Sequence, residues 1–209
     1  MFQMAKLKAI LFNCTLKPKS EPSSTQAMLQ KVIAVLREND VVCTVIHACD
    51  ENILFGVESD MGKGDAWPAI RKKILASDIL VIGTPIWYGQ RSSVCQMVLE
   101  RIDAMLYETN AKGQLPLYNK VAGVCVTGNE DGAQHVGSTI LYNLMQTGAT
   151  IPANSEVYWV GLAGGRDDFK DVALDDGYVA GLVETMGNNL VIMACLLKAH
   201  PYPVKGNKA

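Results

Sequence analysis

Three turns of this chain carry side chains that can hold a ligand, and each turn follows directly after a short apolar run. The first turn combines hydroxyl groups and a cation close to a helix start, namely Thr15, Lys17, Ser23, Ser24 and Thr25. A phosphate favours this combination, because a helix N-terminus presents unpaired N–H donors and a dipole that attracts anions. We therefore expect an anion site here, although Ser24 and Thr25 taken alone would favour an ordinary helix cap. The glycine-rich fingerprints of nucleoside triphosphate and dinucleotide sites are absent.

The second turn, from Thr84 to Ser93, places the aromatic pair Trp87 and Tyr88 between Pro85 and Gly89. Large aromatic side chains at a turn either cover the hydrophobic core or face a flat ligand, because leaving them in water is unfavourable. The glycine permits a close backbone approach. Both roles remain open for this pair, and a flat heteroaromatic molecule is the ligand that such a turn would suit.

The third turn, from Thr127 to His135, has Gly128 and Gly132 around an Asn-Glu-Asp run. Such a turn can direct backbone N–H groups at the polar edge of a ring, although a simple connecting loop has the same composition. Ligands of open α/β sheets bind outside the carboxyl ends of the strands, so the three turns are able to converge on one site.

Other chemistries lack a matching pattern in this sequence. His47, His135 and His200 are far apart without metal-ligand spacing, and there is no G-x-S-x-G elbow, so neither a metal site nor a catalytic serine is expected. Cys14 and Cys95 lie at two of the turns, where a helix start can lower the pKa of a thiol. Packing in the core is the commoner role for such cysteines.

Apolar runs and helical repeats alternate along the chain. Mainly β-branched runs predict strands at residues 7–12, 41–46, 79–83, 121–126 and 157–160. Apolar residues at helical spacing predict helices at residues 24–38, 67–75, 94–107, 136–145 and 175–197. Parallel neighbours need helical crossovers, so this alternation predicts an α/β fold with a doubly wound parallel sheet. Residues 48–65 are expected to form a surface excursion or lid-like segment, and residues 161–176 a loop.

The composition predicts one cytoplasmic domain. A chain of 209 residues, of which 49% are hydrophobic, can bury a full core as a single domain, residues 1–209. The net charge of −2 gives no reason to expect nucleic acid or a membrane surface as a partner. The start of the chain lacks a signal-peptide core, and the longest apolar run, residues 190–197, is too short to span a bilayer. Six cysteines without any C-x-x-C pair favour free thiols in a reducing compartment.

The segment SDILVIGTPIWYGQRSSVCQMVLERID, residues 77–103, resembles the third strand, flavin-ring loop and following helix of the NAD(P)H-dependent FMN reductase family, within the flavodoxin-like superfamily. The segments VTGNEDGAQHV and NCTLKP…PSSTQ are similar to the fourth-strand turn and the phosphate loop of that family. The likeness runs from Lys6 to about Val160. It implies a flavodoxin-like, five-stranded parallel sheet of order 2-1-3-4-5, with helices on both faces and FMN at the switch point.

The resemblance also implies a role for each turn. The phosphate of FMN would be held by Thr15, Lys17, Ser24 and Thr25, although Asn13-Cys14-Thr15 replaces the Gly-Ser opening of the family's phosphate loop. The isoalloxazine ring would be lined by Pro85, Ile86, Trp87, Tyr88 and Gly89. Its polar edge would be approached from the other side by Thr127, Gly128, Asn129 and Gly132.

The function implied by the resemblance is that of an FMN-dependent oxidoreductase. It would take electrons from NADH or NADPH and pass them to a quinone, a flavin or a similar small acceptor, as a homodimer or homotetramer. The chemistry would belong to the flavin, so no catalytic acid or base is named. A flavodoxin-type electron carrier that docks to redox partner proteins is a second interpretation, although a net charge of −2 gives little support for an acidic docking face. A flavin-free module with the same fold is a third, because the phosphate loop departs from the family pattern.

Overall fold

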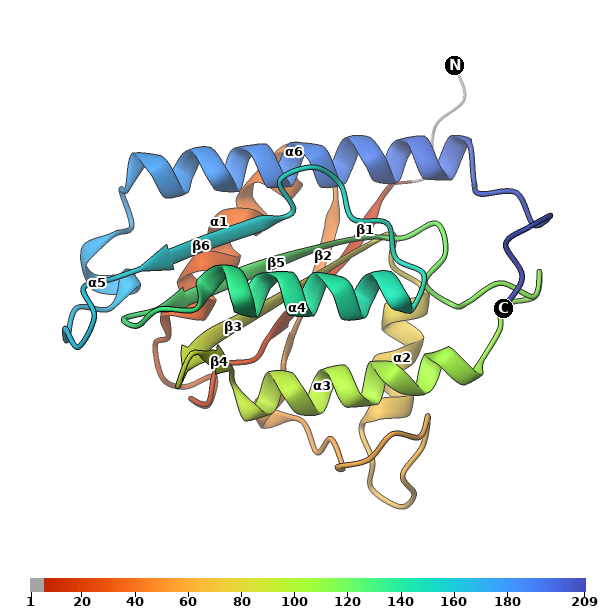
Figure 1. The fold of residues 1–209 in the computed structure, drawn as a ribbon, viewed down its shortest axis with the longest axis horizontal. Helices are drawn as coiled ribbons and strands as arrows, with labels where there is room; N and C mark the ends of the chain where they lie inside the picture. Colours follow the sequence, from red (N-terminus) through yellow and green to blue (C-terminus); the bar gives the residue numbers. More distant parts are fainter. Residues whose placement is uncertain (1–5) are drawn as a thin grey trace.

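The computed structural model describes residues 6–209, so the first five residues of the segment considered above for a signal peptide lie outside it. Five parallel strands form the sheet, in the order β2-β1-β3-β5-β6 (Figure 1). Their bounds are Lys8–Asn13 for β1, Val42–His47 for β2, Ile79–Trp87 for β3, Val121–Gly128 for β5 and Glu156–Val160 for β6. Counted along the chain, these parallel strands have the order 2-1-3-4-5, so the predicted flavodoxin-like sheet is confirmed.

Helices cover both faces of the sheet (Figure 1). Their bounds are Ser24–Glu38 for α1, Trp67–Leu75 for α2, Ser93–Asp103 for α3, Ala133–Gln146 for α4, Phe169–Val172 for α5 and Gly177–Ala199 for α6. Two short 3-10 helices, η1 at Ala48–Asp50 and η2 at Ala104–Tyr107, follow β2 and α3. Helices α1 and α6 pack on one face, while α2, α3 and α4 pack on the other. Each face of the sheet carries its own hydrophobic core. Ile10 and Phe12 of β1 pack in the core under α2, α3 and α4, and Ala9 and Leu11 pack in the core under α1 and α6, because successive side chains of a strand point to opposite faces.

The structure corrects the predicted end of the central strand. Strand β3 continues past Gly83 to Trp87, because β5 also runs on to Gly128 and the ladder between the two strands persists as far as the Pro85–Thr127 pair. The expected loop is therefore a tight hairpin, in which β4, Gln90–Arg91, pairs antiparallel with β3. The expected loop at residues 161–176 likewise contains the short helix α5.

The surface excursion at residues 48–65 is tied to α3 by one buried arginine. Arg101 is fully buried and forms an ion pair of 2.7 Å with Asp65. It also donates to the carbonyl oxygen of Leu54 at 2.6 Å and to that of Glu58 at 2.9 Å. The excursion is thus fixed from inside by a side chain that the sequence presents only as part of an amphipathic helix.

Helix α6 is long and apolar enough to cross a membrane by length and composition alone. The sequence-based expectation rested on the continuous apolar run at residues 190–197, which is shorter than the apolar helix Gly177–Ala199. Here one side of the helix packs on the sheet and on α1, with Val183, Met186 and Leu190 buried. Gly187 allows the two helices to approach closely, since a Cβ there would lie 2.5 Å from Cγ1 of Val35.

Candidate functional site

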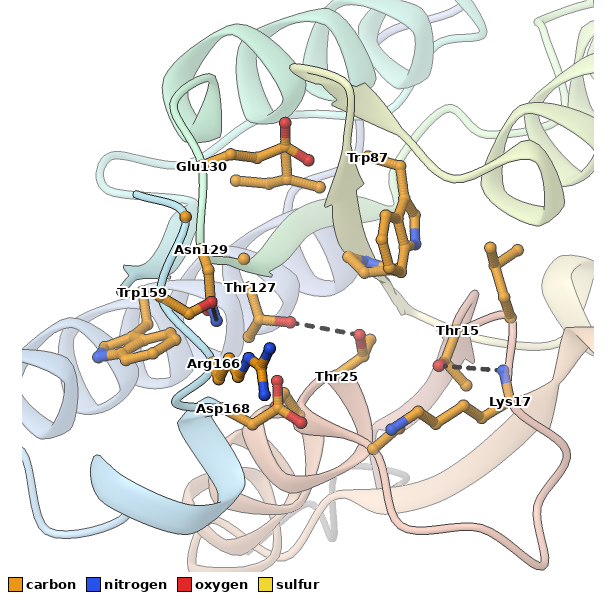
Figure 2. Close-up of a pocket in the computed structure, with 18 residues that line it drawn as sticks. Thr15, Lys17, Thr25, Trp87, Thr127, Asn129, Glu130, Trp159, Arg166 and Asp168 are labelled. Atoms are coloured by element: carbon orange, nitrogen blue, oxygen red, sulfur yellow. Dashed lines mark hydrogen bonds between the residues drawn. The ribbon is translucent and has the colours of Figure 1, made fainter. Parts of the chain in front are cut away.

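A cavity of about 630 Å³ lies at the carboxyl ends of the strands (Figure 2). The three turns predicted from the sequence form three of its walls, and the β6–α5 loop forms the fourth. Strands β1 and β3 are neighbours, yet the helices that follow them, α1 and α3, lie on opposite faces of the sheet. The cavity therefore occupies the switch point at which such folds bind ligands.

The β1–α1 turn supplies hydroxyls and a cation. All four residues expected to hold phosphate, Thr15, Lys17, Ser24 and Thr25, line the cavity. Ser23 also lines it, and its Oγ caps α1 by accepting from the backbone N–H of Gln26 at 3.1 Å. Because the Thr15 Oγ1 accepts from the backbone N–H of Lys17 at 3.3 Å, its own O–H hydrogen remains free to donate.

A buried network fixes the shape of this turn. The Asn13 side chain is fully buried, its Oδ1 accepts from the backbone N–H of Thr15 at 3.1 Å, and its Nδ2 donates to Oε1 of Gln26 at 2.8 Å. The same Nδ2 lies 3.2 Å from Nδ1 of His47, which must accept because an amide nitrogen only donates. Nε2 of His47 therefore carries the hydrogen that it donates to the carbonyl oxygen of Lys17 at 2.8 Å.

His47 is also part of a cluster with Cys49 and Asp50, whose ligand atoms all lie within 4.8 Å of one another. Both ring nitrogens of His47 are already used, and the Cys49 thiol donates to the carbonyl oxygen of Lys17 at 2.9 Å. Asp50 accepts from the backbone N–H of Lys19 at 2.9 Å. This cluster builds the turn, and a metal ion would have to displace these hydrogen bonds.

The β3–β4 hairpin contributes Pro85, Ile86 and Trp87 to the cavity, whereas Tyr88 and Gly89 do not line it. Trp87 is 57% exposed and faces the cavity in Figure 2, while Tyr88 is 98% exposed at the tip of the hairpin. The turn residues Tyr88 and Gly89 have φ values of 56° and 71°, the left-handed conformation that two-residue hairpins of the primed types require.

The β5–α4 turn contributes Thr127, Gly128 and Asn129, together with Glu130, which the sequence analysis did not single out. Gly128 has no room for a side chain, because a Cβ would lie 2.8 Å from Cβ of Ile86. The carboxylate of Glu130 accepts from the backbone N–H of Tyr88 at 2.9 Å, so the turn supports the hairpin.

Gly132 lies outside the cavity and contacts the hairpin instead. It begins α4 with a φ of +117°, and a Cβ there would lie 2.9 Å from the carbonyl oxygen of Gly89. Gly89 and Gly132 thus allow the β3–β4 hairpin and the β5–α4 turn to contact each other closely at the edge of the cavity.

The β6–α5 loop is the part of the site that sequence reasoning missed. The loop lines the cavity with Gly164, Gly165, Arg166 and Asp168, and Trp159 near the end of β6 lies beside them. This loop reaches the cavity because α5 docks on α1, where the backbone N–H of Lys170 donates to Oγ of Ser24 at 3.4 Å. The run Gly-Gly-Arg-Asp-Asp was the available signal, since it places charges beside flexible glycines directly after a strand.

The cysteines at the turns are packing residues. Cys14 and Cys95 are both fully buried, and burial raises the pKa of the Cys14 thiol well above its usual value. Desolvation therefore outweighs any lowering of the Cys14 pKa by the nearby helix start. All six cysteines of the chain are free thiols.

The donor set fits flavin mononucleotide. A flat ring requires apolar and aromatic walls, which Ile86, Trp87 and Trp159 offer, and a backbone that approaches closely, as at Gly128. A phosphate requires hydroxyls, backbone N–H groups and cations, which the β1–α1 turn offers on another side of the cavity. This fold and this site define a flavodoxin-like flavoprotein.

Sequence comparison gives the family directly. The model of the family described as NADPH-dependent FMN reductase matches residues 7–161, and the chain belongs to this family. It is 34% identical over 206 residues to the 8-demethyl-8-aminoriboflavin-5'-phosphate synthase of Streptomyces davaonensis, covering 94% of this chain and 80% of that protein. It is also 37% identical over 169 residues to a Mycobacterium bovis protein named divalent metal cation transporter MntH. That match covers 79% of this chain, which spans only a quarter of the transporter, 25%.

Solved structures agree with this assignment. RosB with bound intermediate 8-demethyl-8-formylriboflavin-5'-phosphate superposes with a TM-score of 0.87 at 32% identity, covering 94% of this chain and 82% of that chain. A flavone reductase superposes with a TM-score of 0.68 at 14% identity, covering 94% of this chain and 66% of that chain. The second likeness is one of fold alone.

Proposed function

We propose that this protein is an FMN-dependent oxidoreductase that takes electrons from NADH or NADPH and delivers them to a small acceptor such as a quinone or a flavin. The observation that carries the proposal is the cavity itself, in which aromatic walls for a flat ring adjoin a hydroxyl-rich turn suited to a phosphate. Membership of the FMN reductase family supports the cofactor and the class of reaction.

The residues of the chain would bind and orient the cofactor. Thr15, Lys17, Ser24 and Thr25 would hold the phosphate, and Ile86 with Trp87 would bound the ring. Backbone groups of the β5–α4 turn, from Thr127 to Asn129, would meet the polar edge. Bound FMN would supply the electron-transfer chemistry, while the protein provides position and exclusion of water.

Three measurements on the full chain test the proposal. The purified protein should show the visible absorption of a flavin, or acquire it when FMN is added. It should then oxidise NADH or NADPH in steady state with a quinone as acceptor. Flavin binding without any oxidation of reduced nicotinamide, whatever the acceptor, would contradict the reductase and favour an electron carrier. A colourless protein that does not bind added FMN would contradict both.

A second candidate function has FMN as the substrate instead of the cofactor. It is favoured by the extent of the likeness to the Streptomyces davaonensis synthase, which covers nearly the whole chain and includes the β6–α5 loop region beyond the family match. Mass spectrometry of flavin recovered after incubation distinguishes the two. Unmodified FMN after many turnovers identifies a cofactor, whereas a flavin of altered mass identifies a substrate.

We further propose a cytoplasmic homodimer or homotetramer. The excursion at residues 48–65 exposes Phe55 and Val57, apolar side chains that are 77% and 51% exposed and would suit a subunit interface. Light scattering of the flavin-loaded protein measures the assembly. A monomer with full activity would contradict this part of the proposal.

A further inference from the structure

The β6–α5 loop holds a charged residue in a defined position at the cavity. Figure 2 shows the Arg166 side chain extending from the loop into the cavity, toward the side where Thr25 lies. The match to the family model ends at residue 161, so Arg166 lies outside the matched segment.

The loop is anchored on both sides of Arg166 by one side chain. Nδ2 of Asn129 donates to the carbonyl oxygen of Asp167 at 2.7 Å and to that of Gly165 at 3.3 Å. The carbonyl oxygen of Asn129 also accepts from the backbone N–H of Gly164 at 3.2 Å. Both hydrogens of this amide are thus used within the protein, and they fix the backbone directly before and after Arg166.

Aromatic packing holds the far end of the loop. The Phe169 side chain is fully buried, and its ring centroid lies 5.8 Å from that of Trp159. One residue further, the backbone N–H of Lys170 contacts Ser24 in the first turn of α1. The loop is therefore held between the β5–α4 turn and the start of α1, which is the side of the cavity expected to hold the phosphate.

Two cations, Lys17 and Arg166, and two carboxylates, Glu130 and Asp168, line the cavity. Asp168 is paired with Lys170 at 3.3 Å, and Glu130 accepts from the backbone of the hairpin. Among residues 6–209, neither Lys17 nor Arg166 forms an ion pair. Both cations therefore lack an ion-pair partner within the described residues, and the phosphate of a bound ligand would supply one.

We propose that Arg166 binds the phosphate of FMN, opposite Lys17, and that Asn129 positions it there. This inference rests on the proposed function, since it assumes that FMN occupies the cavity. A guanidinium group binds phosphate oxygens through two parallel N–H groups, whereas a lysine acts as a single point charge. Arg166 therefore gives the site its preference for the phosphorylated flavin over riboflavin, which has the same ring without the charge.

Dissociation constants of FMN and of riboflavin, measured by quenching of flavin fluorescence, test the assignment. We expect Arg166→Ala to raise the Kd of FMN by about 10- to 100-fold and that of riboflavin by less than about twofold, as expected for a charge-assisted bond to phosphate. The Kd of FMN for Arg166→Lys should lie between that of the native chain and that of Arg166→Ala. Arg37→Ala, at an exposed arginine in the last turn of α1, is the matched control and should leave both constants unchanged.

Asn129→Ala tests the positioning role. It should weaken FMN binding in the native background and add little to the loss in the Arg166→Ala background, because its effect passes through the arginine. Three results overturn the inference: an unchanged Kd for FMN in Arg166→Ala, an equal loss for FMN and riboflavin, or the same loss in Arg37→Ala. If the native chain binds no FMN, the proposed function fails instead, so the two failures are distinguishable.

Discussion

Oγ1 of Thr25 lies 3.3 Å from Oγ1 of Thr127, a hydrogen bond between residues 102 positions apart (Figure 2). Each side chain is only 2% exposed, so the bond joins the first turn of α1 to the end of β5 beneath the cavity. The expected phosphate turn and the expected ring-edge turn are thereby held in one arrangement, whether or not a ligand is bound.

Replacing these two threonines by valine should reveal their coupling. Either single change, Thr25→Val or Thr127→Val, leaves a buried hydroxyl without its partner and should lower the free energy of unfolding by about 1–2 kcal/mol. The double variant should cost clearly less than the sum of the two, because no unpaired hydroxyl remains. Urea unfolding of the four proteins gives the comparison. Strict additivity would show that the bond contributes nothing to stability.

The aromatic pair of the hairpin should divide into two roles. Trp87 lines the cavity, whereas Tyr88 is 98% exposed outside it. We therefore expect Trp87→Ala to weaken FMN binding at least about tenfold, through loss of an aromatic contact surface. Tyr88→Ala should change the Kd of FMN much less. Titration with FMN measures both constants. If Tyr88→Ala releases flavin as strongly as Trp87→Ala, both aromatic side chains contact the ring in the bound state.

Much of this architecture was predictable because it depends on periodicity and turn chemistry. The apolar runs at β1, β3 and β5 and the polar turns after them carry local signals, so the sheet and three walls of the cavity followed from the sequence. The fourth wall did not, because the position of Arg166 depends on hydrogen bonds to Asn129, which lies far away in the chain. The buried state of Arg101 was equally hidden, since a helical pattern does not show which charge will meet Asp65.

Gly132 should not tolerate a side chain, because the β5–α4 turn contacts the β3–β4 hairpin at this position. Alanine there requires a φ of +117° and places a Cβ 2.9 Å from the carbonyl oxygen of Gly89. We expect Gly132→Ala to lower the free energy of unfolding by about 1–3 kcal/mol, through backbone strain and collision with the hairpin.

Gly181→Ala is the matched control. Gly181 lies inside α6 and a Cβ there would meet open space, so alanine should stabilise the helix by about 0.5–1 kcal/mol. Thermal unfolding of both variants checks the opposite signs, and equal shifts would contradict the close contact.

The ion pair between Asp65 and Arg101 should make stability depend on pH in acid. Burial alone would raise the pKa of Asp65, but hydrogen bonds from Arg101 and from the backbone N–H groups of Met61, Trp67 and Leu54 hold it well below its usual range. Because the pKa is lower in the folded than in the unfolded chain, the carboxylate stabilises the fold above about pH 4, and this contribution is lost as the pH falls further. Asp65→Asn leaves Arg101 as a buried charge without an anionic partner and should cost about 3–5 kcal/mol at pH 7.

The gap in unfolding free energy between the native chain and Asp65→Asn should narrow as the pH falls below about 4, because protonation removes the same charge from the native chain. Asp171→Asn is the control, since its carboxylate is 58% exposed and pairs with Lys170 at the surface. A surface ion pair contributes little to stability because water screens it, so this variant should follow the native curve closely. Urea unfolding of the three proteins at several pH values between about 3 and 7 gives the curves. If the difference in unfolding free energy between the native chain and Asp65→Asn stays constant across this range, the ionisation of Asp65 does not cause the loss of stability in acid.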